Sequence, residues 1–220
     1  MQKEIHIMTA RYPDISVPQG KGTLLRGFFA AGQGEGSLLH NHGEQGAGLY
    51  RYPLVQYKII GGVPTVLAIE EGIDAVQPLV IGRQELLLGG RRYPRGQLCL
   101  SLDTAVLGDT EQRCRYRFRT PWFGLNQENY CRYEQAGPEE RQALLKRVLT
   151  GNLLSLSKGL GVTVERRLEV DCALRECSLR FKEENVLGFW GEFCVNFRIP
   201  ELLGLGKSVS RGLGAVVVKA

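Results

Sequence analysis

GLGKSVSRGLGAVVVKA, residues 204–220, is the stretch around which the predicted fold is arranged. Four glycines enclose a short polar run, and an uninterrupted apolar run at 215–218 follows it. Such an apolar run is typical of a strand that is buried on both faces. Glycine allows backbone conformations and close approaches that a Cβ forbids. The stretch therefore predicts a central strand of a sheet, preceded by a loop shaped to lie against something larger than a side chain.

The first half of the chain predicts elements in the order β, α, β, β, α, β. Alternating residues indicate the first strand, and apolar residues on one helical face indicate the first helix. Two apolar runs flank Gly61 and Gly62, which is a strong signal for a β-hairpin. The expected elements are a strand at 3–8, a helix at 23–32, strands at 54–60 and 63–69, a helix at 73–80 and a strand at 85–88.

The second half predicts a similar order after a boundary near residue 108. Pro138, followed by two glutamates near the positive end of a helix, marks the start of a long helix. The expected elements are a strand at 98–102 before the boundary, then a strand at 113–119, a helix at 138–158, strands at 162–168, 177–181 and 187–197, a helical turn at 200 and the final strand. The predicted fold class is α+β, with two tandem ferredoxin-like (RRM-like, βαββαβ) domains at 1–108 and 109–220.

The composition is that of an ordinary soluble protein, with 43% hydrophobic and 23% charged residues. No apolar run approaches the roughly 18 residues that span a bilayer. The N-terminal segment carries charge where a signal peptide is apolar. Lysine and arginine exceed aspartate and glutamate by 28 minus 23, or 5, and the six cysteines form no CxxC pair. We therefore expect a cytoplasmic protein with reduced thiols, a mildly basic charge and no membrane partner.

Arginines alternate with other residues in the segment RCRYRFR, at Arg113, Arg115, Arg117 and Arg119. In a strand these side chains project to one side and lie about 6.6 Å apart, because the rise is about 3.3 Å per residue. This spacing is close to the phosphate repeat of an extended nucleic-acid strand, and guanidinium groups pair with phosphate in a bidentate manner. The alternative is a solvated face that pairs with carboxylates, and the acidic neighbours in the sequence are few. We favour a nucleic-acid track.

A glycine-dense segment at 33–53 carries His40 and His42, followed by Tyr50 and Tyr52. Histidine accepts and donates protons near neutral pH, so this segment offers an acid, a base and hydroxyl donors. Taken alone, an HxH pair in a loop is more often structural or incidental than catalytic. The segment is nevertheless the best catalytic candidate in the chain.

The sequence offers no recognisable metal site, and we expect no metal and no other cofactor. His6 is the third and last histidine, so a zinc site lacks ligands. A dense cluster of carboxylates that would hold magnesium is also missing. If the protein cuts a phosphodiester without metal, the substrate is expected to be RNA, because the 2′-hydroxyl of RNA can attack the adjacent phosphorus.

The glycine-rich segment before the final strand matches neither common nucleotide-binding motif. GLGKS resembles part of a P-loop, but Glu201 stands where the first glycine is required, and Val209 replaces the third glycine of GxGxxG. A plain glycine-rich turn is one interpretation. A cradle for phosphate built from basic, hydroxyl and backbone amide groups is the other. The residues of this predicted cradle are Gly206, Lys207, Ser208, Ser210, Arg211 and Gly212.

Three features together resemble one family: the repeated ferredoxin-like plan, the histidine segment after the first helix, and GLGKSVSRGLG before a terminal strand. They look like the CRISPR-associated endoribonucleases of the RAMP superfamily, which mature repeat-containing guide RNA. The segment TPWFGLNQENY at 120–130 is similar to a subgroup found with the I-B type of system. The resemblance covers nearly the whole chain.

The resemblance implies a metal-independent ribonuclease that binds one CRISPR repeat and cleaves at its 3′ side, leaving a 2′,3′-cyclic phosphate and a 5′-hydroxyl. Carried to this chain, His40 and His42 are the catalytic histidines and Tyr50 supports them. His40 is the expected general acid to the 5′-oxygen, and His42 with Tyr50 acts on the 2′-hydroxyl or the phosphate, although these roles can be exchanged. Lys207 and Arg211 match the loop that the family places near RNA.

The alternative function is a non-cleaving repeat-RNA-binding subunit of a CRISPR ribonucleoprotein, in which the histidine segment is inert. A structural protein without RNA leaves the arginine row and the basic loop unexplained. Besides repeat RNA, the expected partners are other subunits of a CRISPR interference complex. Both a monomer and a homodimer remain open.

Overall fold

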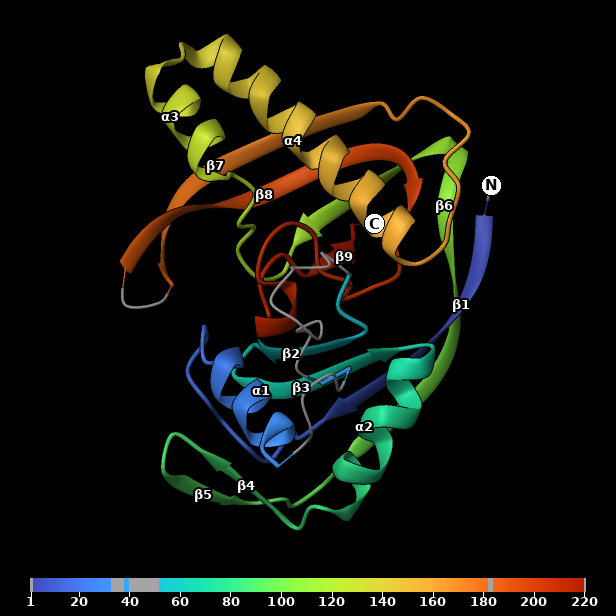
Figure 1. Ribbon diagram of the computed structural model, residues 1–220, viewed down its shortest axis with the longest axis vertical. Coiled ribbons are helices and arrows are strands. Elements are labelled where there is room, and N and C mark those ends of the chain that lie inside the picture. Colours follow the sequence, from blue (N-terminus) through green and yellow to red (C-terminus); the bar gives the residue numbers. More distant parts are fainter. Residues whose placement is uncertain (1, 33–37, 40–51, 182–183, 220) are drawn as a thin grey trace. The chain divides into compact units, whose positions relative to one another are not determined.

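The structure is a computed structural model that describes residues 2–32, 38–39, 52–181 and 184–219 (Figure 1). The chain forms two compact units. The N-terminal unit consists of Glu4–Ala105 together with Val209–Gly212. The C-terminal unit consists of Met1–Lys3, Val106–Ser208 and Leu213–Ala220. The predicted α+β class is confirmed.

The N-terminal unit follows the predicted order of the first half. Strand β3 pairs antiparallel with both β1 and β2, and the predicted hairpin at Gly61 and Gly62 is confirmed, since Ile60 faces Val63 and both glycines have positive φ. β5 was not expected, and it pairs with β4 in a separate two-stranded sheet. The elements are β1 (Gln2–Arg11), α1 (Gly22–Ala30), β2 (Val55–Ile60), β3 (Val63–Ile69), α2 (Glu71–Gly82), β4 (Glu85–Leu88) and β5 (Arg91–Pro94).

Helices α1 and α2 pack on one face of the sheet formed by β1, β2 and β3. Leu25 and Phe29 of α1 and Val76 and Val80 of α2 are buried in the same cluster as Tyr57 of β2. The Phe29 and Tyr57 rings stack with centroids 5.9 Å apart. This apolar cluster fixes the position of α1 against β2. The candidate site residues on these two elements are therefore held in a fixed arrangement.

In the C-terminal unit, β8 pairs antiparallel with β6 on one side and with β7 on the other, and β9 also pairs with β6. Helix α4 lies across β7 and β8 (Figure 1) and buries leucines such as Leu145 and Leu149. The start of α4 at Pro138 is confirmed, and the Glu140 side chain accepts the backbone N–H of Gly137 at 3.1 Å. The elements are β6 (Cys99–Phe118), α3 (Gln127–Gln135), α4 (Pro138–Gly159), β7 (Val170–Phe181), β8 (Glu184–Arg198) and β9 (Val216–Val218).

Several predictions for the second half are wrong. The strands expected at 98–102 and 113–119 are one strand, because β6 continues across the expected boundary near residue 108, with a shift of register between Asp109 and Cys114. Residues 162–168 are not a strand, and helix α3 was missed. The final strand is not central: β9 pairs with β6 alone among the described strands, and Val218 is 54% exposed. The order βαββαβ is present in the N-terminal unit, but β4 joins β5 rather than the larger sheet.

No helix among the described residues has both the length and the apolar character that crossing a membrane requires.

The short helical turn η1 (Val209–Arg211), with Gly212, belongs to the N-terminal unit and packs on α1 and β2. The fit is tight at two glycines. A Cβ on Gly22 would overlap the carbonyl oxygen of Arg211 and lie 2.6 Å from that of Tyr57. A Cβ on Gly212, which has φ +96°, would lie 2.7 Å from the Tyr57 carbonyl oxygen. The turn therefore sits directly on the backbone of the two elements, with no side chain between them.

Gly22→Ala is expected to destabilise the protein by about 1–3 kcal/mol, because the new methyl group meets fixed backbone atoms. Gly27→Ala is the matched control on the same helix: a Cβ there has no atom within 4 Å, so the better helix former is expected to stabilise by about 0.5–1 kcal/mol. Urea unfolding followed by circular dichroism measures both. If Gly22→Ala were as stable as Gly27→Ala, the described packing of the turn on α1 would be wrong.

Candidate nucleic-acid interface

The predicted catalytic residues His40, His42 and Tyr50 lie outside the described residues. The residues next to this segment are described. Leu39 is 2% exposed and belongs to the core of the N-terminal unit. On the other side, Tyr52 is 8% exposed, and its hydroxyl accepts a hydrogen bond from Gln56 Nε2 at 3.0 Å.

The turn at 209–212 brings Arg211 close to Arg26 of α1. Burial first, and the positive charge of Arg211 second, lower the pKa of Arg26. The hydroxyl of Tyr57 is also close: burial raises its pKa, and the charge of Arg26 partly offsets this effect. Within the described part of the chain, this hydroxyl is buried and has no hydrogen-bond partner. Two cations that repel each other beside a buried hydroxyl favour the binding of an anion.

The predicted phosphate cradle is divided between the two units. Gly206, Lys207 and Ser208 belong to the C-terminal unit, whereas Ser210 and Arg211 belong to the N-terminal unit with Gly212. The backbone N–H of Lys207 donates to the Phe123 carbonyl at 2.7 Å, and its ammonium lies 5.3 Å from the Phe123 ring centroid. Burial lowers the pKa of Lys207.

Gly206 and Ser208 of the cradle have a left-handed backbone conformation, and Ser210 is buried. These properties limit which of their polar groups a ligand can contact. Gly206 has φ +88°, and a Cβ there would lie 2.8 Å from Trp122 Nε1. Ser208 has φ +56°, an unusual value for a residue other than glycine. Ser210 is 9% exposed. The cationic side chains and the backbone, rather than the Ser210 hydroxyl, are therefore the groups that a ligand can reach most easily.

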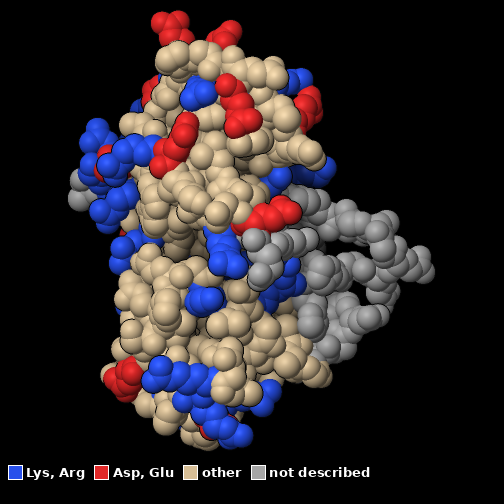
Figure 2. All heavy atoms as spheres, turned by 90° about the vertical axis from the view of Figure 1, so that its left-hand side faces the viewer, with Lys and Arg blue, Asp and Glu red and all other residues tan. Residues whose placement is uncertain are grey.

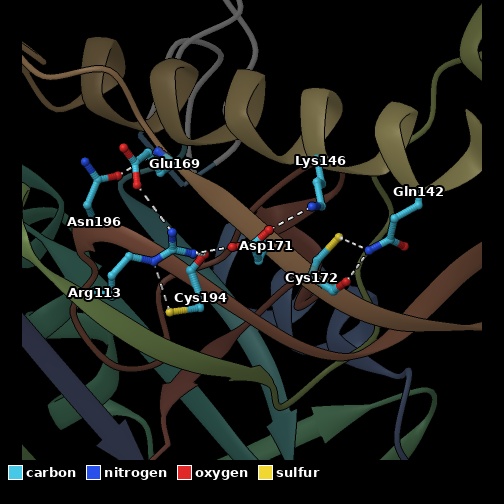
Figure 3. A network of polar contacts seen from close by, with 8 residues as sticks. All are labelled: Arg113, Gln142, Lys146, Glu169, Asp171, Cys172, Cys194 and Asn196. Carbon is cyan, nitrogen blue, oxygen red and sulfur yellow. Dashed lines mark hydrogen bonds and ion pairs between the residues drawn. The ribbon is translucent and has the colours of Figure 1, made fainter. Parts of the chain in front are cut away.

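Arg113, Arg115 and Arg117 of the arginine row lie on β6 as predicted, and Arg119 directly follows the strand. All four arginines are exposed, while Tyr116 and Phe118 between them are buried. Its acidic surroundings differ from the expectation. Arg113 Nη2 donates to Asp171 Oδ2 at 2.7 Å, and Arg113 Nη1 lies 3.4 Å from Glu169 Oε2 (Figure 3). Both carboxylates come from the β7 region, far from Arg113 in the sequence, so the expectation of few acidic neighbours is wrong.

The contacts of Arg113 belong to a larger polar network. Asp171 also accepts from Lys146 of α4 at 2.7 Å, and Arg113 Nε donates to Cys194 Sγ at 3.5 Å (Figure 3). The hydrogen bonds of Cys194 and Asp171 raise the pKa of Arg113. The Arg113 guanidinium therefore links β6 to β7 and β8 by hydrogen bonds and ion pairs. Its N–H groups are less available to a ligand than those of the other arginines in the row.

The remaining arginines of the row are Arg115, Arg117 and Arg119, and their side chains make no hydrogen bond or ion pair with a described residue. Their charge is partly balanced by Glu192 of β8, whose pKa is lowered by a hydrogen bond from Lys219 and by the charges of Arg115 and Arg117. On the face that Figure 2 shows, basic side chains gather in several groups, and acidic side chains lie beside some of them. Such groups suit contacts with separate phosphates.

Lys58 of β2 is a buried cation that sequence reasoning missed. It is fully buried, and burial lowers its pKa to about 7. Its ammonium donates to Gln56 Oε1 at 2.8 Å. The signal was present, because Gln56 and Lys58 interrupt an apolar strand at alternate positions, VQYKII. A polar pair with this period indicates one strand face that differs from the apolar face packed on α1.

No group of three or more His, Cys, Asp or Glu side chains that could hold a metal ion occurs in residues 2–32, 38–39, 52–181 and 184–219. His6 of β1 lies with its Nδ1 3.3 Å from Glu70 Oε2 at an exposed position.

Two family models together match nearly the whole chain. Residues 3–104 match the Cas6b N-terminal domain and residues 108–218 match the Cas6b C-terminal domain. A crystal structure of Cas6b is 37% identical, with a TM-score of 0.94, covering 99% of this chain and 100% of that chain. The structure of a CRISPR RNA processing endoribonuclease, Cas6b, is 35% identical, with a TM-score of 0.82 and the same coverage of both chains.

A curated protein of Methanocaldococcus jannaschii, described as uncharacterized, is 36% identical over 140 residues, which are 63% of this chain and 95% of that protein. The similarity extends to a more distant structure, Csf5, a CRISPR-Cas type IV Cas6 crRNA endonuclease, at 12% identity and a TM-score of 0.63. At that identity the likeness shows the fold alone.

Lys58→Met is expected to remove a pH dependence of stability. Unfolded lysine titrates near pH 10.4, whereas folded Lys58 has a pKa of about 7. Between these values the unfolded chain binds one more proton, so the free energy of unfolding rises with pH in this window. From pH 7 to 9.5 the rise due to Lys58 amounts to about 3 kcal/mol.

Urea unfolding at the two pH values measures this difference in the unmodified protein and in Lys58→Met. Lys21→Met, at an exposed position of the same unit, serves as the control and keeps the full dependence. An equal rise in Lys58→Met and in the unmodified protein would contradict the buried, largely neutral state of Lys58.

Proposed function

This chain belongs to the Cas6b family, and we propose that it is an endoribonuclease that cleaves CRISPR precursor RNA within its repeats. Support comes from the CRISPR RNA processing endoribonuclease Cas6b, which is similar over the whole length of both chains. A product complex of a Thermus thermophilus Cas6 has the same general fold at 13% identity and a TM-score of 0.54. The proposed partner is accordingly repeat RNA.

One observation of the structure carries the proposal furthest. The C-terminal turn at 209–212 packs on α1 and β2, so that Arg211 and Arg26 lie close to each other in the N-terminal unit. The segment with His40 and His42 connects these same two elements in the chain. A pair of guanidinium groups, together with the proton donors and acceptors of the segment that links α1 and β2 in the sequence, suits a reaction at an RNA phosphate.

The proposed reaction uses the substrate's own nucleophile. The 2′-oxygen forms a bond to the adjacent phosphorus while the bond from phosphorus to the 5′-oxygen breaks. The proton of the 2′-hydroxyl passes to a base, and a proton from an acid reaches the leaving 5′-oxygen. The products are a 2′,3′-cyclic phosphate and a 5′-hydroxyl, and this chemistry requires no metal ion.

We assign the general acid to His40, and we assign the activation of the 2′-hydroxyl or the holding of the phosphate to His42, with Tyr50 hydrogen-bonding the same group. Arg26 and Arg211 pair with the oxygens of the scissile phosphate and stabilise the charge that develops on them.

We further propose that Gly206, Lys207 and Ser208, with Ser210, Arg211 and Gly212, hold the RNA backbone next to the cut site. The boundary between two domains is proposed at 104–108, where the two family models meet. Each domain is then a variant of the ferredoxin-like plan, in which β4 of the first has moved to a separate hairpin with β5.

His40→Ala is expected to lower the single-turnover rate of repeat cleavage by about 10²- to 10⁴-fold, because the leaving oxygen loses its proton donor. Binding of the repeat should change by less than about twofold, since the affinity comes mainly from phosphate contacts. Both quantities are measured in EDTA with end-labelled repeat RNA, and a repeat with a 2′-deoxy group at the cut site serves as the uncleavable control.

Two results would contradict this scheme. Cleavage of the 2′-deoxy repeat would rule out the 2′-hydroxyl as nucleophile. Tight binding without any cleavage by the unmodified protein would favour the alternative of a non-cleaving RNA-binding subunit.

Arg26→Gln and Arg211→Gln are each expected to slow cleavage about tenfold and to reduce the slope of log Kd against log salt by about 0.7, the value for one phosphate of a single strand. The double variant should lose less than the sum of the two single losses, because both groups contact one phosphate. Arg147→Gln, at an exposed position of α4, is the control. Strict additivity of the two single effects would mean that the arginines bind different phosphates.

A further inference from the structure

An open pocket of about 880 Å³ lies on the sheet of the C-terminal unit, and the catalytic scheme does not use it. Residues of three adjacent strands line it, among them Arg117 of β6, Trp190, Gly191 and Glu192 of β8, and Ala173 and Arg175 of β7.

Trp190 is partly exposed beside this pocket, which sets it apart from the other tryptophan of the chain. Trp122 is fully buried, and its indole N–H donates to Asn152 Oδ1 at 2.9 Å. Across the antiparallel ladder, Trp190 stands directly opposite Arg175, and Glu192 stands opposite Arg117. Neighbouring strands are about 4.8 Å apart and residues two apart along a strand are about 6.6 Å apart, so the backbones of Arg117 and Arg175 stand about 12 Å apart on either side of Trp190. Side chains as long as arginine can converge from there on the two phosphates that flank one nucleotide.

Small residues keep the space beside the indole open. Ala173 contributes a methyl group, and Gly191 contributes no side chain. Gly191 has φ +142°, and a Cβ there would overlap the carbonyl oxygen of Ala173. Because a Cβ at this position would meet the backbone of β7, the lining of the pocket at residue 191 is strand backbone alone.

The two acidic residues of the pocket are already paired with cations. Glu192 accepts hydrogen bonds from Lys219 Nζ at 2.6 and 2.7 Å. Glu176 accepts from the Tyr133 hydroxyl at 2.8 Å and lies 3.6 Å from Arg141. By contrast, the side chains of Arg117 and Arg175 make no hydrogen bond or ion pair with a residue that the structure describes. The charge that remains for a ligand is therefore positive.

We propose that this pocket binds an unpaired nucleotide of the RNA, with its base stacked on Trp190 and its flanking phosphates paired with Arg117 and Arg175. The inference rests on the proposed function, and it adds an RNA-binding surface on the C-terminal unit. An aromatic ring flanked by two guanidinium groups suits a single strand, because every base has a flat face while the phosphates repeat. An acidic peptide would match the charge but would leave the indole without a flat partner.

Intrinsic fluorescence tests the stacking directly, because Trp190 and Trp122 are the two tryptophans of the chain. Adding the uncleavable 2′-deoxy repeat is expected to quench the emission of the unmodified protein, since a base on the indole quenches Trp190. The same titration of Trp190→Phe should leave the emission unchanged, because Trp122 is fully buried. Quenching that persists in Trp190→Phe would overturn the assignment.

Affinity provides the second measurement. Trp190→Ala is expected to raise the Kd of the uncleavable repeat about tenfold, and Trp190→Phe should recover most of this loss, because a phenyl ring still stacks. Arg175→Gln should lower the slope of log Kd against log salt by about 0.7, whereas Arg147→Gln at an exposed position of α4 serves as the matched control. The single-turnover cleavage rate at saturating protein should stay within about twofold in all four variants.

Two further outcomes would overturn the inference alone, and a third outcome marks a failure of the proposed function. Unchanged affinity in Trp190→Ala, with cleavage intact, would reject the pocket and keep the endoribonuclease. Emission that responds to protein concentration and not to RNA would identify the surface as a contact between copies of the chain. Absence of both binding and cleavage in the unmodified protein would reject the proposed function itself.

Discussion

The close packing of the Val209–Gly212 turn on α1 and β2 is the constraint on which the candidate site depends. Where the backbones meet, Gly22 and Gly212 leave room for carbonyl oxygens that any side chain would displace. The backbone of the turn is thereby fixed, and Arg211 is held near Arg26 although the two charges repel. Apolar packing of α1, through Leu25 and Phe29, balances this repulsion. A fold that holds two cations together in this way is prepared for an anion before the anion arrives.

The N-terminal unit also retains polar groups that reduce its stability. Lys58 is fully buried, and the Tyr57 hydroxyl has no hydrogen-bond partner among the described residues. Both lie on β2, yet they belong to opposite faces of the strand, so one packing defect does not explain them both. Groups of this kind lower stability by amounts comparable to the whole stability margin of a domain, and they are concentrated at functional sites. Lys58 and Tyr57 lie beside the Val209–Gly212 turn, which agrees with a functional site that lowers the stability of the unit.

Local patterns in the sequence correctly predicted the features of the fold that depend on residues close together in the chain. The hairpin at Gly61 and Gly62, the start of α4 at Pro138 and the exposed arginines of β6 follow from turn chemistry, capping and period-two alternation. The predictions that failed depend on distant partners. β6 continues through its polar segment because β8 pairs with it on both sides of a register shift. Asp171 reaches Arg113 across the sheet from 58 residues away, and no local pattern contains that information.

Hydrogen bonds and ion pairs between neighbouring strands also divide the arginine row into a paired end and an end with unused donors. Arg113 is held by Asp171 and Cys194, so an RNA phosphate could bind it only by displacing groups that already satisfy its donors. Further along the strand, Glu192 is occupied by Lys219, which leaves Arg117 with unused donors. A strand with four equivalent arginines would bind any polyanion along its length. Pairing one end with carboxylates restricts the usable charge to the end near Trp190, where a flat ring adds a preference for unpaired bases that charge alone cannot supply.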